Sequence, residues 1–295
     1  MRAMTALVKR EYREHRIAFV IAPAVLLTIV TVAVVFAILF GFGDVDVPAA
    51  EIPLGAQVYR VATGGAFALW SAYLLIGLFF YYADSFSADR RNNALLFWKS
   101  MPQSDLKILT SKALSGLTIF LAIIACFALL TSVLIYVVLL IASTQAPIVA
   151  APGLIEALWS LVQMGVVGAI FLALTVLWYA PGLAWVAGLS TLFRRWSIPL
   201  AILIPGTAIL LEYLNSLRAT GAGRPIADFL GWRFETFMNE EDAVLTIFGQ
   251  ADRAPFALLS QMLGNINWLH MAIGWVFTAA IVYLASEYRR RRIEA

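Results

Sequence analysis

Few side chains in this chain of 295 residues could perform chemistry, and their spacing forms no catalytic or metal-binding motif. The candidates for metal ligation or thiol chemistry are His15, His270 and the single Cys126, which lie far apart in the sequence. A zinc hydrolase would carry His-Glu-x-x-His on a helix, and a serine hydrolase Gly-x-Ser-x-Gly at a sharp turn. Neither occurs, so we expect no metal site and no catalytic residue.

ATP hydrolysis by this chain is excluded on the same basis. A phosphate-binding loop reads Gly-x-x-x-x-Gly-Lys-Ser/Thr, because its backbone N–H groups and its lysine hold the phosphates. The sequence contains no Gly-Lys pair, and the triplet Leu114, Ser115, Gly116 matches only a fragment of an ATPase signature. We therefore expect no cofactor to be bound by this chain.

Glu212 is an acidic residue near the outer end of a strongly apolar run. An ionisable group at membrane depth suggests a functional site, so Glu212 is a candidate for lining a substrate path. The alternative is a carboxylate at the level of the lipid headgroups, since Asn215 and Arg218 follow closely.

The composition shows that the candidate residues belong to a membrane domain. Hydrophobic residues make up 62% of the chain and charged residues 13%, and the mean hydropathy is +0.85. An average soluble domain is about half apolar and about a quarter charged. Most of the surface must therefore face lipid.

Six apolar runs are long enough to cross a bilayer, which takes about 20 residues of helix. We predict an all-α integral membrane protein forming one domain over 1–295. The run 158–193 is too long for one straight span, and Pro181 followed by Gly182 predicts a break in it. The fifth run is short and carries Pro199 and Pro205. The expected spans are 17–43, 61–83, 113–142, 158–193, 198–214 and 268–286.

Basic residues predict the orientation, since loops rich in Lys and Arg stay in the cytoplasm. With six spans and both termini cytoplasmic, all but five of the 21 Lys and Arg residues fall inside. We expect the bacterial inner membrane as the location. The five outside are Arg60, Arg218, Arg224, Arg233 and Arg253.

Residues 1–16 are predicted to form an amphipathic interfacial helix. Met4, Leu7, Val8 and Tyr12 share one face, and the basic residues occupy the other. Such a helix can anchor to anionic headgroups or dock a cytoplasmic subunit. Glu11 and His15 fall inside the apolar face, which favours a protein partner. The basic residues are Arg2, Lys9, Arg10, Arg13 and Arg16.

The cytoplasmic segment 84–112 is too long and too apolar for a simple solvated loop. Residues 95–98 form a consecutive apolar patch, Leu-Leu-Phe-Trp, of the kind that marks an interface. The alternative is that this patch folds back on the bilayer with Trp98 as an anchor. Pro102 ends the patch, and Ser104 is expected to cap the helix that enters the third span, with Asp105 in its first turn.

This segment resembles the corresponding loop in permeases of the bacterial type-2 ABC transporter family. The shared pattern is Asp89-Arg90-Arg91, then Leu96 to Pro102 (Leu-Phe-Trp-Lys-Ser-Met-Pro), then Ser104, Asp105 and Lys112. A second block from Leu177 to Pro181, with Trp185 and Ser190 to Arg195, also resembles that family. Met101 replaces the family's usual leucine, and Asn92 and Asn93 stand where charged residues are commoner.

The resemblance implies a coupling helix between spans 2 and 3 that binds a separate ATPase, and a smaller contact between spans 4 and 5. It further implies two ATPase copies carrying ATP and Mg, and a second permease copy or related chain in the lipid bilayer; no nucleic acid is expected. The ATPase-binding residues would be Asp89, Arg90, Arg91, Phe97, Trp98, Lys99, Met101, Pro102, Asp105, Arg194 and Arg195.

The outer segment 215–267 is predicted to hold short interfacial or re-entrant helices, because its apolar stretches are too short to span. It also resembles the helical hairpin that precedes the sixth span in exporters of that family.

Three functional classes follow. The first is the permease subunit of an exporter for an amphipathic substrate. The second is a secondary transporter or a channel without an ATPase; the middles of spans 1, 2, 3 and 6 lack the ionisable pairs that ion coupling uses. The third, an intramembrane enzyme, would need a catalytic dyad at membrane depth, and none is evident.

Overall fold

The computed structural model describes residues 2–40, 55–91, 104–145, 151–193, 196–218, 223–234 and 255–294, and every regular element in these ranges is helical. The all-α fold expected from the sequence is confirmed at this level. The elements are α1 (Arg2–Arg16), the π-helical η1 (Ile17–Ile21), α2 (Ala22–Phe40), α3 (Gly55–Arg91), α5 (Asp105–Ser115), the π-helical η3 (Gly116–Phe120), α6 (Leu121–Gln145), α7 (Leu154–Phe193), α8 (Ser197–Arg218), α9 (Pro225–Phe234), α11 (Pro255–Asn265) and α12 (Trp268–Glu294).

Within the described ranges six helices are long and apolar enough to cross a membrane, which indicates a multi-pass membrane protein. Each lies over one of the six apolar runs of the sequence. The helices extend beyond those runs: α3 has 37 residues and α7 has 40. At about 1.5 Å per residue, α7 is roughly 60 Å long, twice the roughly 30 Å hydrocarbon core of a bilayer.

The expected break at Pro181 is wrong, because α7 continues as helix through this residue to Phe193. Proline removes the hydrogen bond to the carbonyl four residues earlier, which is that of Leu177. Here the indole Nε1 of Trp275 on α12 donates to the Leu177 oxygen at 3.2 Å. Membrane helices tolerate proline where a neighbouring helix supplies such a donor.

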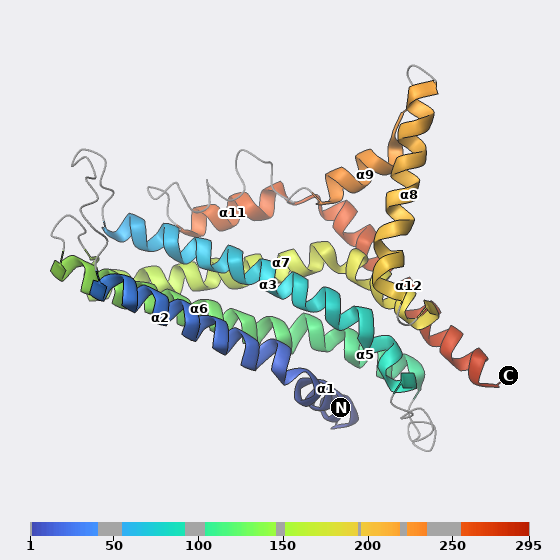
Figure 1. Cartoon of the computed structure of the whole chain (residues 1–295), viewed down its shortest axis with the longest axis horizontal. Helices are drawn as coiled ribbons and strands as arrows, with labels where there is room; N and C mark the ends of the chain where they lie inside the picture. The colour runs from blue at the N-terminus through green and yellow to red at the C-terminus, as the bar shows by residue number, and fades with distance from the viewer. Residues whose placement is uncertain are drawn as a thin grey trace.

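The centre of the molecule is the pair α3 and α7 (Figure 1). In their most apolar stretches 50% of α3 and 56% of α7 is buried within the protein, against 11% for the spans that contain α2 and α8. The central pair packs between α6 on one side and α12 on the other. The peripheral helices therefore present most of their apolar surface to the surroundings, as lipid-facing helices do.

Contacts between α3 and the α5–α6 segment run in opposite order along the two chains. The indole of Trp70 donates to the Thr131 hydroxyl at 2.8 Å. Further along α3, the Tyr82 hydroxyl donates to the Ala113 carbonyl at 2.7 Å. Because the residue number rises on α3 and falls on its partner, these helices are antiparallel.

In contrast, α3, α7 and α12 are parallel to one another. Along α3 and α7 the contacting residue numbers rise together, because Phe67 meets Gly168 and Ala83 clusters with Leu189. The same holds for α7 and α12, where Pro181 meets Gly274 and Gly188 meets Ile281. The end of α3, the start of α5 and the end of α12 therefore share one end of the bundle. We call it the inner end, following the orientation expected from the basic residues.

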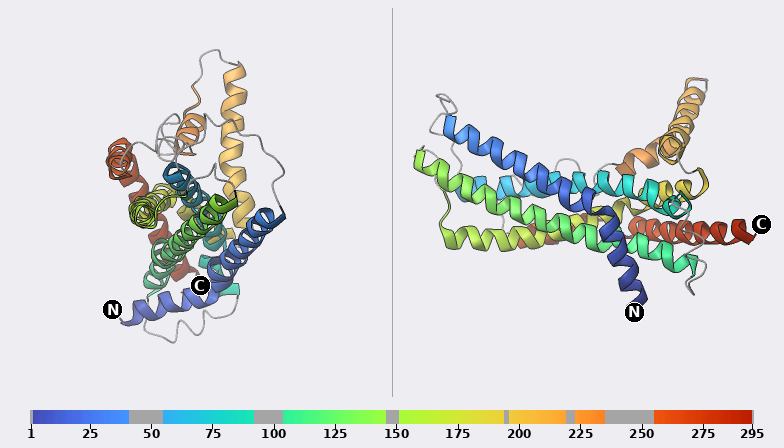
Figure 2. Two further views of the ribbon diagram at one scale, coloured as in Figure 1. Left: turned by 90° about the vertical axis from the view of Figure 1, so that its left-hand side faces the viewer. Right: turned by 60° about the horizontal axis from the view of Figure 1, so that its bottom comes forward.

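Helix α8 leaves the inner end and projects away from the bundle, across the direction of the other long helices (Figures 1 and 2). Its start is tied to α3, because the Ser197 hydroxyl donates to the Ala83 carbonyl at 3.1 Å. Pro205 lies within the helix without ending it. The fifth apolar run is thus a helix of spanning length that stands apart from the other five.

Two short helices, α9 and α11, lie in the outer segment, in agreement with the expectation of helices too short to span. α9 packs along α8, and α11 packs along α7. α12 starts three residues after α11 ends, so the two form an interrupted helix beside α7 (Figure 1). The arrangement of residues 235–254 as part of a hairpin lies outside the described residues.

Candidate functional site

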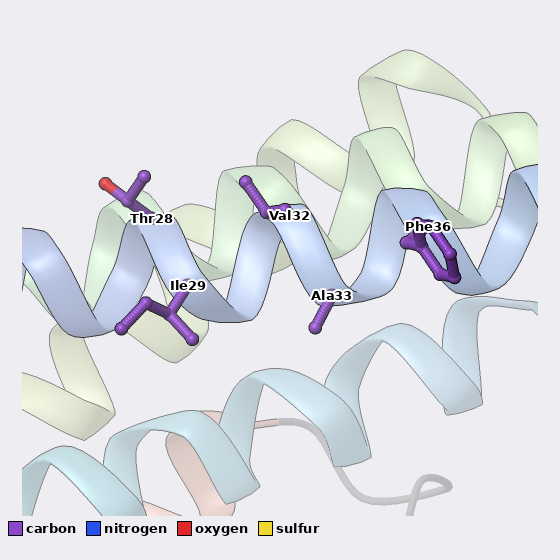
Figure 3. A pocket seen from close by; sticks show the side chains of 5 residues that line it. All are labelled: Thr28, Ile29, Val32, Ala33 and Phe36. Carbon is purple, nitrogen blue, oxygen red and sulfur yellow. The ribbon is translucent and has the colours of Figure 1, made fainter.

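An open apolar pocket of about 510 Å³ lies along α2 and offers no chemistry (Figure 3). Its one polar lining residue is Thr28, whose hydroxyl already donates to the Ala24 carbonyl at 2.8 Å. The remaining lining residues are Ile29, Val32, Ala33 and Phe36. A surface of this kind suits lipid tails. A functional site needs polar groups, and these are buried elsewhere in the molecule.

Polar groups are buried at the inner end, where α1 docks on the bundle through one face. Buried and half-buried residues recur every three or four positions on this face, at Val8, Glu11, His15 and Phe19. This spacing places them on one side of a helix. They face α5 of the same chain rather than lipid or a separate subunit. The opposite face exposes Lys9, Arg13 and Arg16.

We call Glu11, Tyr81 and Lys112 the ionic cluster, because they join α1, α3 and α5 through a buried ion pair. The Lys112 ammonium lies 2.9 Å from Glu11 Oε1, and the Tyr81 hydroxyl donates to Glu11 Oε2 at 3.0 Å. The side chains of Lys112 and Glu11 are only 1% and 4% exposed. Removing one partner of such a pair leaves a buried charge uncompensated, at a cost of about 3–5 kcal/mol.

His15 extends the ionic cluster by one helical turn. Its Nε2 lies 3.8 Å from Glu11 Oε2, and its ring meets the Tyr81 ring edge-on with centroids 4.7 Å apart. Glu11, Glu14 and His15 lie close enough to share an ion. Glu11 is bound by the Lys112 ammonium, and Glu14 pairs with Arg10.

A second ion pair joins the start of α5 to the end of α12. Arg289 Nε lies 3.5 Å from Asp105 Oδ1, and the arginine side chain is 1% exposed. The expected cap of α5 is confirmed: the Ser104 hydroxyl accepts from the Lys107 N–H at 3.4 Å. The first turn of α5 is therefore held by its own cap and by α12, whereas α1 binds the last turn of α5 through Lys112.

Two π-helical turns connect α1 and α5, at the inner end, to the long helices that follow them. η1 follows α1 and η3 follows α5, and their rings Phe19 and Phe120 stack face to face with centroids 3.9 Å apart. Gly116 opens η3, and a Cβ there would overlap the Tyr82 hydroxyl. π-Turns are rare and often mark functional positions. The chain bends at η1, so that α1 leaves the line of α2 (Figure 2).

The structure reaches only part of the predicted ATPase-binding set. Asp105 is engaged with Arg289, as described above. Asp89, Arg90 and Arg91 form the last residues of α3, so the helix extends past the apolar run to carry them. The remaining residues lie outside the described part of the chain: Phe97, Trp98, Lys99, Met101, Pro102, Arg194 and Arg195.

Glu212 caps a helix. Its Oε1 accepts from the Ile226 N–H at 2.8 Å and its Oε2 from the Ala227 N–H at 2.9 Å. These are N–H groups of the first turn of α9, which lack partners within the helix and favour a negative charge. Glu212 thus ties α8 to α9, and its place on a substrate path stays a prediction.

The positions of Glu11 and His15 on the apolar face of residues 1–16 suggested a protein partner but identified no residue that binds them. Lys112 was named only within the family pattern, and Arg289 was one of the basic residues assigned to the inside. The usable signal was a carboxylate and a lysine, each at the edge of an apolar run. Pairing them required the fold, because 101 residues separate Glu11 from Lys112.

Comparison with protein-family models, with curated proteins and with solved structures finds no match to this chain.

Proposed function

We propose that this chain is the permease subunit of an ATP-driven exporter, moving an amphipathic substrate and powered by a separate ATPase. The observation that carries the proposal is the loop pattern around residues 89–105, together with the way the returning end of that loop is held. The loop leaves from the end of α3 and returns at Asp105, and the returning end is fixed by the Asp105–Arg289 ion pair.

The contacts at the inner end support this proposal, because they would transmit motion from the loop to α5 and α1. A partner that pushed on the loop would move the start of α5, and through Lys112 and Glu11 it would move α1 as well. Buried ion pairs resist separation, so the load would pass to η1 and η3, where the helices change pitch. A coupling role needs two things: a rigid contact where the partner pushes, here the start of α5, and a connection to the long helices that can change shape, here η1 and η3.

The test is association with an ATPase. Tagged chain is co-expressed with the ATPase encoded beside it, where one exists, and purified in detergent. We expect co-purification and ATP-dependent transport in vesicles. Failure to co-purify, or transport that persists without ATP, would overturn the proposal in favour of a secondary transporter or a channel.

The double variant Arg91→Ala with Trp98→Ala locates the interface. We expect at least a ten-fold loss of bound ATPase, since Trp and Arg are the residues that dominate interface energies. Tyr12→Ala is the control, because it removes an exposed aromatic residue of α1 that is not part of the loop pattern. Equal ATPase recovery in all three proteins would remove the loop from the interface.

A further inference from the structure

A half-buried cation, Arg233, lies far from the inner end, where the outer segment meets the bundle. Arg233, in the last turn of α9, reaches the part of α7 that contains Pro181. Along α12 this point is level with Gly274, about 22 Å from Arg289 at about 1.5 Å per residue. Burial lowers the pKa of the Arg233 guanidinium, as expected for a cation partly removed from water.

Arg233 and Trp178 hold each other through three interactions. Arg233 Nη2 donates to the Trp178 carbonyl at 2.6 Å, and the Trp178 indole N–H donates back to the Arg233 carbonyl at 3.1 Å. The guanidinium carbon also lies 4.0 Å from the centre of a Trp178 ring. A cation above an indole ring is a favourable contact, more so when water is excluded. Trp178 is 2% exposed.

The acceptors on α7 lie in the turn before Pro181. Pro181 cannot donate to Leu177, whose carbonyl instead accepts from the Trp275 indole. The next carbonyl, that of Trp178, accepts from Arg233; a backbone carbonyl has two lone pairs and can accept a donor from outside its helix. The two carbonyls form a polar notch in an apolar helix, and a planar, multi-donor guanidinium suits such a notch.

Helix α12 closes the notch from the other side. A Cβ on Gly274 would stand 2.7 Å from Pro181 Cγ and 2.8 Å from Arg233 Nη2. Only a glycine allows this approach. Beside it, the Trp232 ring lies 4.6 Å from the His270 ring on α12. Three elements, α7, α9 and α12, therefore meet at one arginine.

The rest of α9 is attached differently. It has ten residues, its start is tied to α8 through Glu212, and residues such as Ile226 and Phe229 are exposed. A short, exposed helix belongs to the parts of a fold that open locally at low cost. Its hold on α7 depends on the last turn, where Trp232 and Arg233 lie.

We propose that Arg233 is a latch: it locks the end of α9 to the Trp178 carbonyl and ring beside Pro181 in α7, and its release frees α9 from the bundle while the helices beneath stay folded. If the chain is a permease, the latched state holds the outer part of the path closed. That consequence rests on the proposed function, whereas the latch itself does not.

The experiment is hydrogen exchange measured by mass spectrometry on the full chain, purified alone in detergent. In Arg233→Ala we expect amides of 225–234 to exchange at least about ten-fold faster, the effect of losing a charged hydrogen bond and a cation–π contact. Arg224→Ala is the matched control: it removes an exposed arginine next to α9 whose ring contact is with Tyr213 on α8, and we expect less than a two-fold change at 231–234.

Two further variants keep the test decisive if Arg233→Ala does not fold. Arg233→Lys keeps the charge and loses the planar fork, and Trp178→Phe keeps a ring and loses the indole donor; each should give a smaller increase confined to 225–234. Unchanged exchange in these variants would overturn the latch, and so would an equal increase across all helices. Loss of ATPase association would leave the latch intact and overturn only the proposed function.

Discussion

The ionic cluster and the Arg233 latch each hold a cation between three helices, fully buried in the first and half-buried in the second, and they satisfy it in opposite ways. Lys112 is neutralised by the carboxylate of Glu11 at 2.9 Å. The partners of Arg233 within the described residues are neutral, namely a carbonyl and an indole ring of Trp178. One contact is an ion pair fixed in place, and the other is a set of dipolar contacts that water or another group can replace.

This difference indicates which part of the molecule is rigid and which part opens. Breaking a buried ion pair strands a charge, which costs several kcal/mol. Releasing an arginine from neutral partners costs less, because the charge regains its hydration as it leaves. The inner end is thus suited to transmit force, and the α9 contact is suited to open and close.

The largest expected effect is at the ionic cluster. Lys112→Met leaves Glu11 buried without a cation and should destabilise the chain by about 3–5 kcal/mol, whereas adding Glu11→Gln should restore most of the loss. Apparent melting temperature in one detergent measures both. Glu14→Gln is the control, since its pair with Arg10 is exposed and worth about 0.5 kcal/mol. Equal instability of the single and double variants would show that packing, and not charge pairing, dominates here.

The next effect is at Gly116, behind the ionic cluster. Gly116→Ala forces its methyl group into Tyr82, which must give up its bond to Ala113. We expect a loss of about 1–3 kcal/mol in unfolding free energy, typical of overpacking. Gly182→Ala is the matched control because its Cβ meets nothing within 4 Å. Similar melting temperatures for the two variants would mean that the inner end is softer than we infer.

A smaller effect is expected from the same substitution at the latch. Gly274→Ala places a methyl group against Pro181 and the end of the Arg233 side chain. The end of the arginine can move aside, but the Pro181 ring must shift with its helix, so we expect about 1 kcal/mol of global stability to be lost, at the low end of overpacking costs, with faster exchange of α9 amides. A loss as large as that of Gly116→Ala would erase the contrast between the two regions.

The smallest effect is expected at Glu212. Glu212→Gln keeps one acceptor for the first turn of α9 and removes the charge, so the cost should be about 0.3–1 kcal/mol. Exchange of the Ile226 and Ala227 amides measures it. An altered response of the partner ATPase to substrate, with unchanged exchange, would instead restore Glu212 to a substrate path.

The helical fold and its membrane character were predictable because they depend on local composition. Each apolar run became a helix, and Ser104 capped α5 as expected from its side chain and position. The break at Pro181 was not predictable, since its outcome depended on Trp275, 98 residues away along the chain. The direction of α8 was likewise hidden, because an apolar run records length and hydropathy but not neighbours.

The candidate site was predictable only in outline. The oddly placed Glu11 and the proline in α7 were both visible, but their partners Lys112 and Arg233 were not, because each pair joins helices remote in sequence. The interpretation of Glu212 changed for the same reason, since its partners belong to α9. The loop residues that resemble a coupling helix remain a prediction from the sequence alone.

The sequence by itself determined that this chain folds as membrane helices, because about 20 consecutive apolar residues can satisfy their backbone in lipid only as helix. Which charges are buried, and which groups bind them, depends on the tertiary structure. A lysine or an arginine can lie inside an apolar bundle only where a carboxylate, a carbonyl or a ring meets it, and those groups come together only when the helices pack.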